Sequence, residues 1–146
     1  MSRREQLLDV IEQDIQQDSE DYLVLRKLMQ DLYAQLLLRD CQQIDQLNLQ
    51  INQLIEQLRT RAQRRNKIIT AFGIMAGNQA MQTLFSAFPA PRGDRLQKQW
   101  AQLTRLVVEC KELNERNGKL LSMHNDILSK LLNVGADSPL YTPQFY

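Results

Sequence analysis

The chain has 146 residues, with 18 Lys and Arg against 17 Asp and Glu, so its formal net charge is +1. This length fits one domain, and the balance of charges removes net charge as a reason to expect a nucleic-acid or anionic membrane partner. Gly (five) and Pro (four) are scarce, as they are in helical, coiled-coil-like proteins.

Residues 4–66 contain neither Gly nor Pro, and apolar residues recur there at the heptad spacing of packed helices. The first row steps by three and four residues through Leu8, Ile11, Ile15, Asp18, Tyr22, Leu25, Met29, Leu32 and Leu36. The second row runs through Ile44, Leu47, Ile51, Leu54 and Leu58. The rows are out of phase across residues 39–43, so we expect two helices, about 4–38 and 41–66. Asp40, with Gln43 three residues on, is expected to cap the second helix.

Charge favours an antiparallel pairing of these two helices. Residues 1–40 carry nine acidic and five basic side chains, whereas residues 59–67 carry five basic and no acidic ones. A turn near residue 41 would therefore bring opposite charges together as exposed ion pairs, each worth up to about 1 kcal/mol. The expected partners are Arg61, Arg64 and Arg65 with Asp14, Asp18, Glu20 and Asp21. No aromatic residue is interleaved with the bases, so we expect no nucleic-acid partner.

Residues 67–92 are small, apolar and nearly uncharged, and they predict one or two short helices followed by a loop that ends in proline. The stretch GIMAG within them matches GxxxG, but polar residues close by leave no membrane-spanning apolar run around it. The large apolar side chains of residues 67–92 allow two interpretations: they extend a binding groove, or they cap the end of a helical bundle. These side chains are Met75, Met81, Phe85 and Phe88.

A third long helix is expected at about 94–133, with Asp94 as its cap. Its apolar seam passes through Leu96, Trp100, Leu103, Val107, Cys110, Asn114, Asn117, Leu121, His124, Leu128 and Leu131. A second apolar row beside it consists of Leu106, Leu113, Leu120 and Ile127, so this helix can contact two partners at once. Gly135 is expected to end it, and residues 135–146 to form a flexible tail.

The expected fold is all-α: an elongated antiparallel bundle of three long helices, spanning residues 1–134 with the short insert 67–92. Cys41 and Cys110 fall at apolar helical positions without the spacing of a metal site, so we expect reduced cysteines in the core of a cytoplasmic protein. His124 is expected to be a partly buried core residue. There is no P-loop, GxGxxG or HExxH motif, no signal peptide and no run of 18 apolar residues. We therefore expect no enzyme activity, catalytic residue, cofactor, metal or membrane insertion.

The stretch ELNERNGKLL, residues 112–121, places Asn114, Asn117 and Gly118 in the middle of the last helix. Gly in a helix interior costs about 1 kcal/mol relative to Ala, and Asn is also unfavourable there. Two explanations are open: the polar residues fix the register of the bundle, or the stretch forms a place where another chain packs.

This stretch resembles the flagellar export chaperone family FlgN. The family motif is seen here as Leu113, Asn114, Asn117, Gly118, Leu120 and Leu121. The N-terminal MSRREQLLDVI, the lengths of the first two helices and the LY pair in the tail are also similar to that family. The insert 67–92 looks longer and more apolar than in its short members.

The resemblance implies a cytoplasmic chaperone, not an enzyme, whose clients are the hook-filament junction proteins, hook-associated proteins one and three. Such chaperones bind the C-terminal helical segment of the client, prevent premature assembly and deliver it to the cytoplasmic domain of the export gate. Tyr141, in SPLY, matches the tail tyrosine implicated in docking to the gate.

The client-binding residues expected from the resemblance are Leu113, Asn114, Asn117, Gly118, Leu120, Leu121, Ile127, Leu128 and Leu131. For each leucine and isoleucine among them, the alternative is that the side chain belongs to the hydrophobic core of the bundle and does not contact a client. Weak self-association is also compatible with the sequence. The competing function is a coiled-coil scaffold or oligomerisation protein without client specificity.

Overall fold

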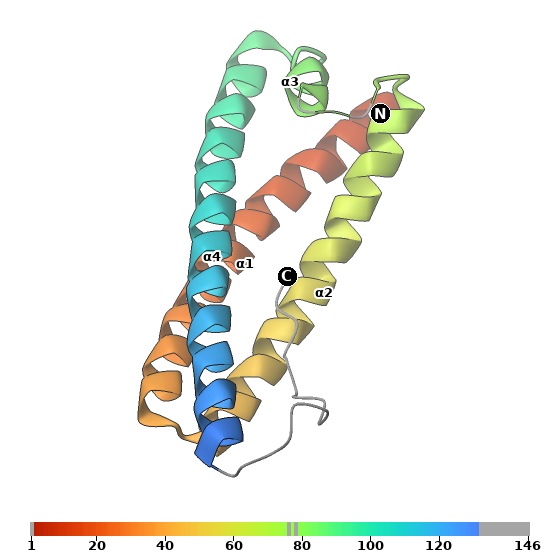
Figure 1. Cartoon of the computed structure of the whole chain (residues 1–146). Coiled ribbons are helices and arrows are strands. Elements are labelled where there is room, and N and C mark those ends of the chain that lie inside the picture. Colours follow the sequence, from red (N-terminus) through yellow and green to blue (C-terminus); the bar gives the residue numbers. More distant parts are fainter. Residues whose placement is uncertain (1, 76, 78, 132–146) are drawn as a thin grey trace.

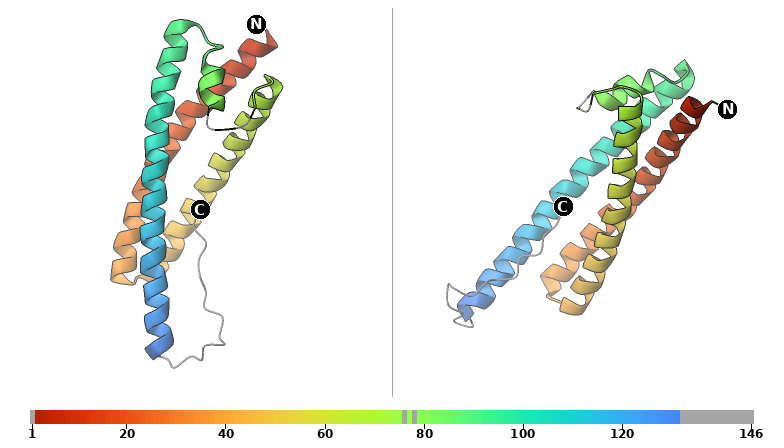
Figure 2. Two further views of the ribbon diagram at one scale, coloured as in Figure 1. Left: turned by 45° about the horizontal axis from the view of Figure 1, so that its top comes forward. Right: turned by 90° about the vertical axis from the view of Figure 1, so that its right-hand side faces the viewer.

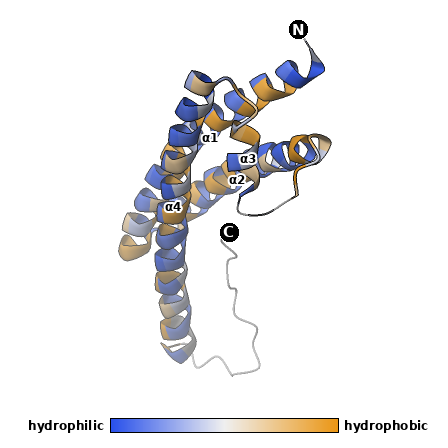
Figure 3. Cartoon of the chain, turned by 90° about the horizontal axis from the view of Figure 1, so that it is seen from above, coloured by the Kyte–Doolittle hydropathy of each residue, from blue (hydrophilic) through white to orange (hydrophobic). Residues whose placement is uncertain are grey.

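The structure is a computed structural model that describes residues 2–75, 77 and 79–131, except for the side chains of residues 128 and 129. Over these residues it contains four helices and no strand: α1 (Arg3–Leu38), α2 (Cys41–Ala71), α3 (Ala80–Phe85) and α4 (Ala90–Leu131). The expected all-α bundle of three long helices is confirmed (Figure 1). Hydrophilic and hydrophobic residues alternate along each long helix, as amphipathic packing requires (Figure 3).

Helix α1 is the central element of the bundle, because it packs against both α2 and α4. Between the described parts of α2 and α4, by contrast, no pair of Cα atoms lies within 8 Å. Two hydrogen bonds between α1 and α4 join residues with the same sequence separation of 88. The two helices are therefore parallel and stay in one register, as Figure 2 also shows.

The turn between α1 and α2 forms where the two apolar rows lose their common phase. Arg39 adopts a left-handed conformation with φ of 57°, and its N–H bonds back to α1 to end that helix. The Asp40 side chain accepts a hydrogen bond from the backbone N–H of Gln43 at 3.2 Å. The expected cap of the second helix is thus confirmed.

The core consists of two buried clusters that follow the predicted rows. The upper cluster is formed by the first half of α1, the end of α2, α3 and the start of α4, and the lower cluster by the second half of α1, the earlier part of α2 and the middle of α4. In the first row every position is buried except Tyr22, which is half-buried and contacts both clusters. In the second row Ile51 and Leu58 are buried, and Ile55, which the row did not include, is buried beside them. The face of α2 that contacts the core is therefore broader than its heptad row predicted.

The ends of the helices around the insert differ from the predicted ones. Helix α2 continues to Ala71 rather than ending near residue 66, because Ile68 and Ile69 are buried in the upper cluster. Helix α4 begins at Ala90 rather than near residue 94, so Asp94 lies within its first turns and does not cap it. Pro91 is tolerated there because the first N–H groups of a helix need no intrahelical partner.

The insert caps the upper end of the bundle. Met81, Phe85 and Phe88 are buried in the upper cluster, whereas Met75 is exposed. A Cβ atom at Gly93 would lie 2.8 Å from the carbonyl oxygen of Phe85, so only glycine lets α4 begin this close to the end of α3. Of the two interpretations of the Met and Phe residues, the structure supports the cap for these three.

A cluster of carboxylates and guanidinium groups joins α1 to α2. Arg61 Nε lies 2.5 Å from the carboxylate of Asp18, which also pairs with Arg65. Arg61 further pairs with Asp21, and Arg64 holds Asp14 through two hydrogen bonds of 2.9 and 2.5 Å. The predicted antiparallel pairing is confirmed for these residues, but Glu20 is exposed and makes no ion pair with another described residue.

The expectation that these ion pairs are exposed is wrong for Asp18 with Arg61 and Arg65, whereas the Arg64 side chain, paired with Asp14, is 50% exposed. Only 1% of the Asp18 side chain and 12% of each of Arg61 and Arg65 is exposed, because the carboxylate occupies the core face of α1. Burial disfavours the Arg61 cation, but hydrogen bonds and charge attraction from Asp18 and Asp21 outweigh that effect and raise its pKa. Removing one member would therefore leave a buried charge without its counterion.

Replacing Asp18 with asparagine tests this cluster, because Asp18→Asn keeps the shape of the side chain and removes its charge. We expect the free energy of unfolding to fall by about 3 kcal/mol or more, measured by urea denaturation with circular dichroism. Glu20→Gln makes the same chemical change at an exposed position and should alter stability by less than about 0.5 kcal/mol. Equal effects of the two substitutions would show that the cluster behaves as surface charge.

Candidate functional site

Asn117 lies fully buried at the contact between α4 and α1. Its Nδ2 donates a hydrogen bond to the backbone carbonyl of Met29 at 2.9 Å, and its Oδ1 has no partner among the described residues. Seven residues earlier, the Cys110 thiol donates to the carbonyl of Tyr22 at 3.6 Å. Polar groups that bond across a buried seam favour one register over others, so this geometry supports the register explanation for Asn117.

The remaining residues of the 112–121 stretch also contribute to the interior. Asn114 is buried, and Gly118 is half-buried. Leu113, Leu120 and Leu121 are half-buried against the lower cluster. The half-buried leucines keep part of their surface open to solvent, and together with the buried asparagines they hold the middle of α4 on the bundle.

Beyond this stretch three apolar side chains of α4 that the structure describes are exposed. Met123 is 58% exposed, Ile127 38% and Leu131 74%. Leu37 and Leu38, at the end of α1, are 56% and 72% exposed, and the 88-residue register places them level with residues 125 and 126 of α4. We call these five residues the end patch. Figure 2 shows that α4 extends past the turn between α1 and α2 at this end.

Two of the expected site residues cannot be placed in this way. The side chain of Leu128 and all of Tyr141 lie outside the part of the chain that the structure describes.

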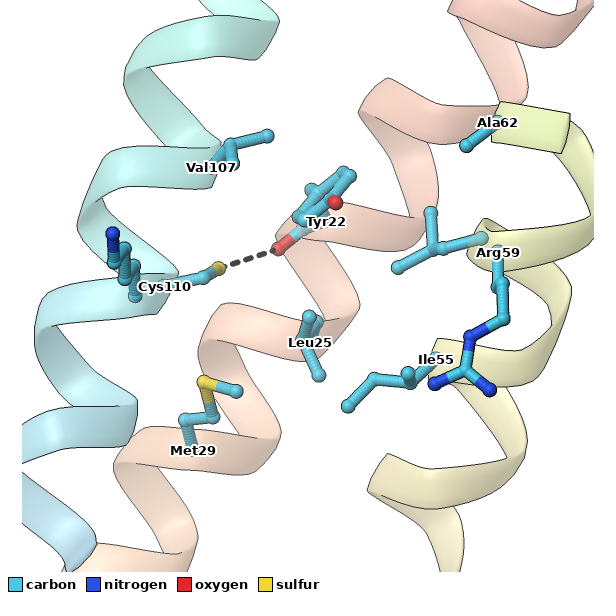
Figure 4. Close-up of a pocket in the computed structure, with 10 residues that line it drawn as sticks. Tyr22, Leu25, Met29, Ile55, Arg59, Ala62, Val107 and Cys110 are labelled. Carbon is cyan, nitrogen blue, oxygen red and sulfur yellow. Dashed lines mark hydrogen bonds between the residues drawn. The ribbon is translucent and has the colours of Figure 1, made fainter. Parts of the chain in front are cut away.

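A second surface feature is a groove with α1 as its floor and α2 and α4 as its walls (Figure 4). It encloses a cavity of about 330 Å³. The lining residues are Tyr22, Leu25, Met29, Ile55, Leu58, Arg59, Ala62, Val107, Cys110 and Lys111. Sequence reasoning missed this groove, because periodicity places residues on faces but does not show that α2 and α4 stay apart.

Apart from Arg59 and Lys111 at its rim, the residues that line the groove are uncharged at neutral pH. Burial raises the pKa of the Cys110 thiol from its ordinary value of 9.0 to about 11; the charge of Glu109 adds to the shift and that of Arg26 opposes it. Burial, followed by the charge of Asp18, also raises the pKa of Tyr22. Arg59 and Lys111 stand on opposite walls, and Arg59 pairs with Glu56 on its own helix at 2.9 Å.

Comparison with known protein families identifies the chain. The family described as FlgN protein matches residues 1–139, which include all four helices. The chain belongs to the FlgN family. Among curated proteins and among solved structures, none matches it significantly.

FlgN proteins are flagellar export chaperones and bind hook-associated proteins, and theirs is a chaperone family, not an enzyme family. The resemblance seen in the sequence is therefore confirmed. The family match ends before Tyr141, so the suggested role of this tyrosine depends on its place in SPLY alone.

No group of His, Cys, Asp and Glu side chains within the described ranges is arranged to hold a metal ion, and His124 is half-buried. None of the described helices is long and apolar enough to cross a membrane. Both cysteines are free thiols, but the expectation that both lie in the core is wrong for Cys41. It is exposed because it begins α2, before the apolar row of that helix starts.

Raising the pH tests the burial of Cys110. The thiol pKa is raised in the folded chain, so the stability it contributes is present below pH 9.0 and lost as the pH rises through about 11. We expect the free energy of unfolding to fall more steeply over that interval in the wild type than in Cys110→Ser, which cannot ionise. Cys41→Ser should show the same pH dependence of stability as the wild type. The raised pKa of Tyr22 contributes equally to the pH dependence of all three chains. Parallel curves for wild type and Cys110→Ser would contradict a buried, neutral thiol.

Proposed function

We propose that this FlgN chain holds hook-associated proteins one and three in the cytoplasm, prevents their premature assembly and delivers them to the export gate. The observation that carries this proposal is the end patch, a set of exposed apolar side chains at the end of α4, the helix that contains the 112–121 stretch, and at the end of α1. Five of the large exposed apolar side chains of the described residues lie at this end of the bundle, and an exposed apolar patch is typical of a protein-binding surface.

The patch suits the C-terminal helical segment of a client. An unfolded amphipathic segment exposes an apolar stripe that gains free energy when it packs on a complementary helix face. Met123 adds an adaptable side chain, which helps a chaperone to accept more than one client. We assign direct client contact to Leu113, Leu120, Leu121, Ile127, Leu128 and Leu131.

The polar members of the motif have a different part in this proposal. Asn114 and Asn117 are buried, and Asn117 bonds to the backbone of α1. We assign to these two residues and to Gly118 the role of positioning α4, so that the exposed apolar residues beyond them are held in one place. Tyr141 is assigned to docking at the cytoplasmic domain of the export gate.

Charge at the end patch tests client binding. We expect the double variant Ile127→Asp with Leu131→Asp to bind hook-associated proteins at least about tenfold more weakly, because a carboxylate cannot be buried unpaired in an apolar contact. Co-purification from the same cell measures this, with and without the client's C-terminal helical segment. The wild type should form a one-to-one complex that is lost when the segment is deleted.

The control is Val108→Asp, which places the same charge at an exposed apolar position of α4 outside the end patch. A complex that survives the double substitution would remove the end patch from the proposal. Absence of any complex, with the chain running as a stable multimer, would favour the scaffold function instead.

Docking to the gate is tested separately from client binding. We expect Tyr141→Ala to leave client affinity unchanged within about twofold, and to reduce secretion of hook-associated proteins several-fold. Secretion into the medium and co-purification are measured on the same strains. Tyr146→Ala, which removes another aromatic ring from the tail, serves as the control. Equal secretion by the Tyr141 and Tyr146 variants would refute the special role of Tyr141.

A further inference from the structure

Arg116 lies on the face of α4 that the proposed function assigns to the client. It follows Leu113 by three residues and precedes Leu120 by four, so the three side chains lie within about 60° of one another around the helix axis. The members of the end patch on α4 lie within the same angle of Arg116, and they are Met123, Ile127 and Leu131. A helical segment that contacts both leucines therefore passes over Arg116.

The guanidinium group of Arg116 rests on the ring of Tyr33 in α1. Its central carbon lies 3.6 Å from the ring centre, which is a van der Waals contact and a favourable cation–π distance. Tyr33 is half-buried, and Leu37 of the end patch follows it by one turn of α1. The pair of Arg116 and Tyr33 therefore adjoins the end patch on both helices.

Among the described residues, Arg116 has no ion-pair partner. The carboxylates nearest to it along α4, those of Glu112 and Glu115, are not paired with it. By contrast, Glu109, seven residues earlier on the same face, pairs with Arg26 of α1 at 2.9 Å. Stacking occupies a face of the guanidinium plane and leaves the N–H donors at its edge available to a carboxylate.

Client binding would change the surroundings of this charge. Arg116 is exposed in the free chain, so water hydrates its guanidinium group. A helix packed on the leucines to either side would remove that water, and an ionised group buried without a counterion is strongly unfavourable. A carboxylate on the bound segment would offset the loss through a charge-assisted, bidentate pair. An apolar stripe alone is therefore an incomplete match for this face.

We propose that Arg116 is a specificity-determining residue that pairs with a carboxylate in the C-terminal helical segment of the client. This inference rests on the proposed function. The carboxylate belongs to an Asp or Glu side chain of the segment or is its terminal carboxylate. Tyr33 is a positioning residue, because its ring holds the guanidinium in place before the client arrives. A segment that lacks the carboxylate would leave Arg116 buried and unpaired, and would be rejected.

Charge reversal at Arg116 tests the pairing. Isothermal titration calorimetry at physiological ionic strength would measure binding of a synthetic peptide of the client's C-terminal helical segment to wild type, Arg116→Glu and Lys111→Glu. Lys111 is also exposed, but it lies about 140° from Arg116 around α4. We expect Arg116→Glu to weaken binding by about tenfold or more and Lys111→Glu by less than about twofold. Thermal unfolding verifies that both variants fold.

Substitutions in the peptide identify the partner group. Each Asp is replaced by Asn, each Glu by Gln and the terminal carboxylate by an amide, one change at a time. We expect one of these changes to weaken binding to the wild type by about tenfold and to leave binding to Arg116→Gln unchanged, because the pair is already broken there. If the group is a side chain, lysine in its place should restore binding to Arg116→Glu.

The positioning role of Tyr33 is tested through the same coupling. Tyr33→Phe keeps the ring and should bind the peptide as the wild type does. Tyr33→Leu removes the ring, so we expect Arg116→Gln to weaken binding less in that background than in the wild type. Equal weakening in the two backgrounds would refute the positioning role.

Three results would overturn the pairing and leave the proposed function in place. Arg116→Glu binds the peptide as tightly as the wild type, or no carboxylate of the peptide is coupled to Arg116. In the third, deleting residues 132–146 abolishes the effect of Arg116→Glu, which would place the partner group in the chain's own tail. If the wild type does not bind the peptide at all, the proposed function itself fails.

Discussion

The carboxylate of Asp18, buried between Arg61 and Arg65, is the interaction on which the rest of the structure depends. It fixes α2 on α1 one helical turn above the groove. Arg65 also lies over the ring of Trp100, so one guanidinium group connects all three long helices. An ion pair at such a place stabilises little compared with an apolar core, but it disfavours every alternative packing that would leave its charges unpaired.

A second constraint acts on the other side of α1. The Cys110 thiol and the Asn117 amide both bond to backbone carbonyls of α1, one heptad apart. These bonds hold α4 against α1, and the ion cluster separately holds α2 against α1. The backbones of α2 and α4 therefore stay more than 8 Å apart and meet only through side chains such as Arg65 and Trp100. The groove is therefore a consequence of how the helices are attached, and it needs no separate feature in the sequence.

The sequence predicts those parts of the fold that depend on local spacing. The heptad row of α1, the cap formed by Asp40 and the pairing of Arg61 with Asp18 follow from period, turn chemistry and charge. The burial of that ion pair could not be predicted, because a charged residue in an apolar row is compatible with a solvated edge or a buried cluster. The bounds of α2 and α4 depend on contacts with α3 that no local pattern encodes. For the same reason the family's motif was visible in the sequence, while the space between α2 and α4 was not.

Because α1 and α4 are parallel and in register, the length of the hairpin formed by α1 and α2 determines how much of α4 lies beside α1. At a separation of 88 residues, the last residue of α1, Leu38, is level with residue 126, so Ile127 and Leu131 lie past the support that α1 offers. The amount of apolar surface left open on α4 is thus set by where the neighbouring hairpin stops. A hairpin longer by one heptad would run alongside Ile127 and Leu131, and a shorter one would uncover the half-buried leucines. Changes in hairpin length are therefore a route by which related chains could come to hold different partners, with no substitution in α4.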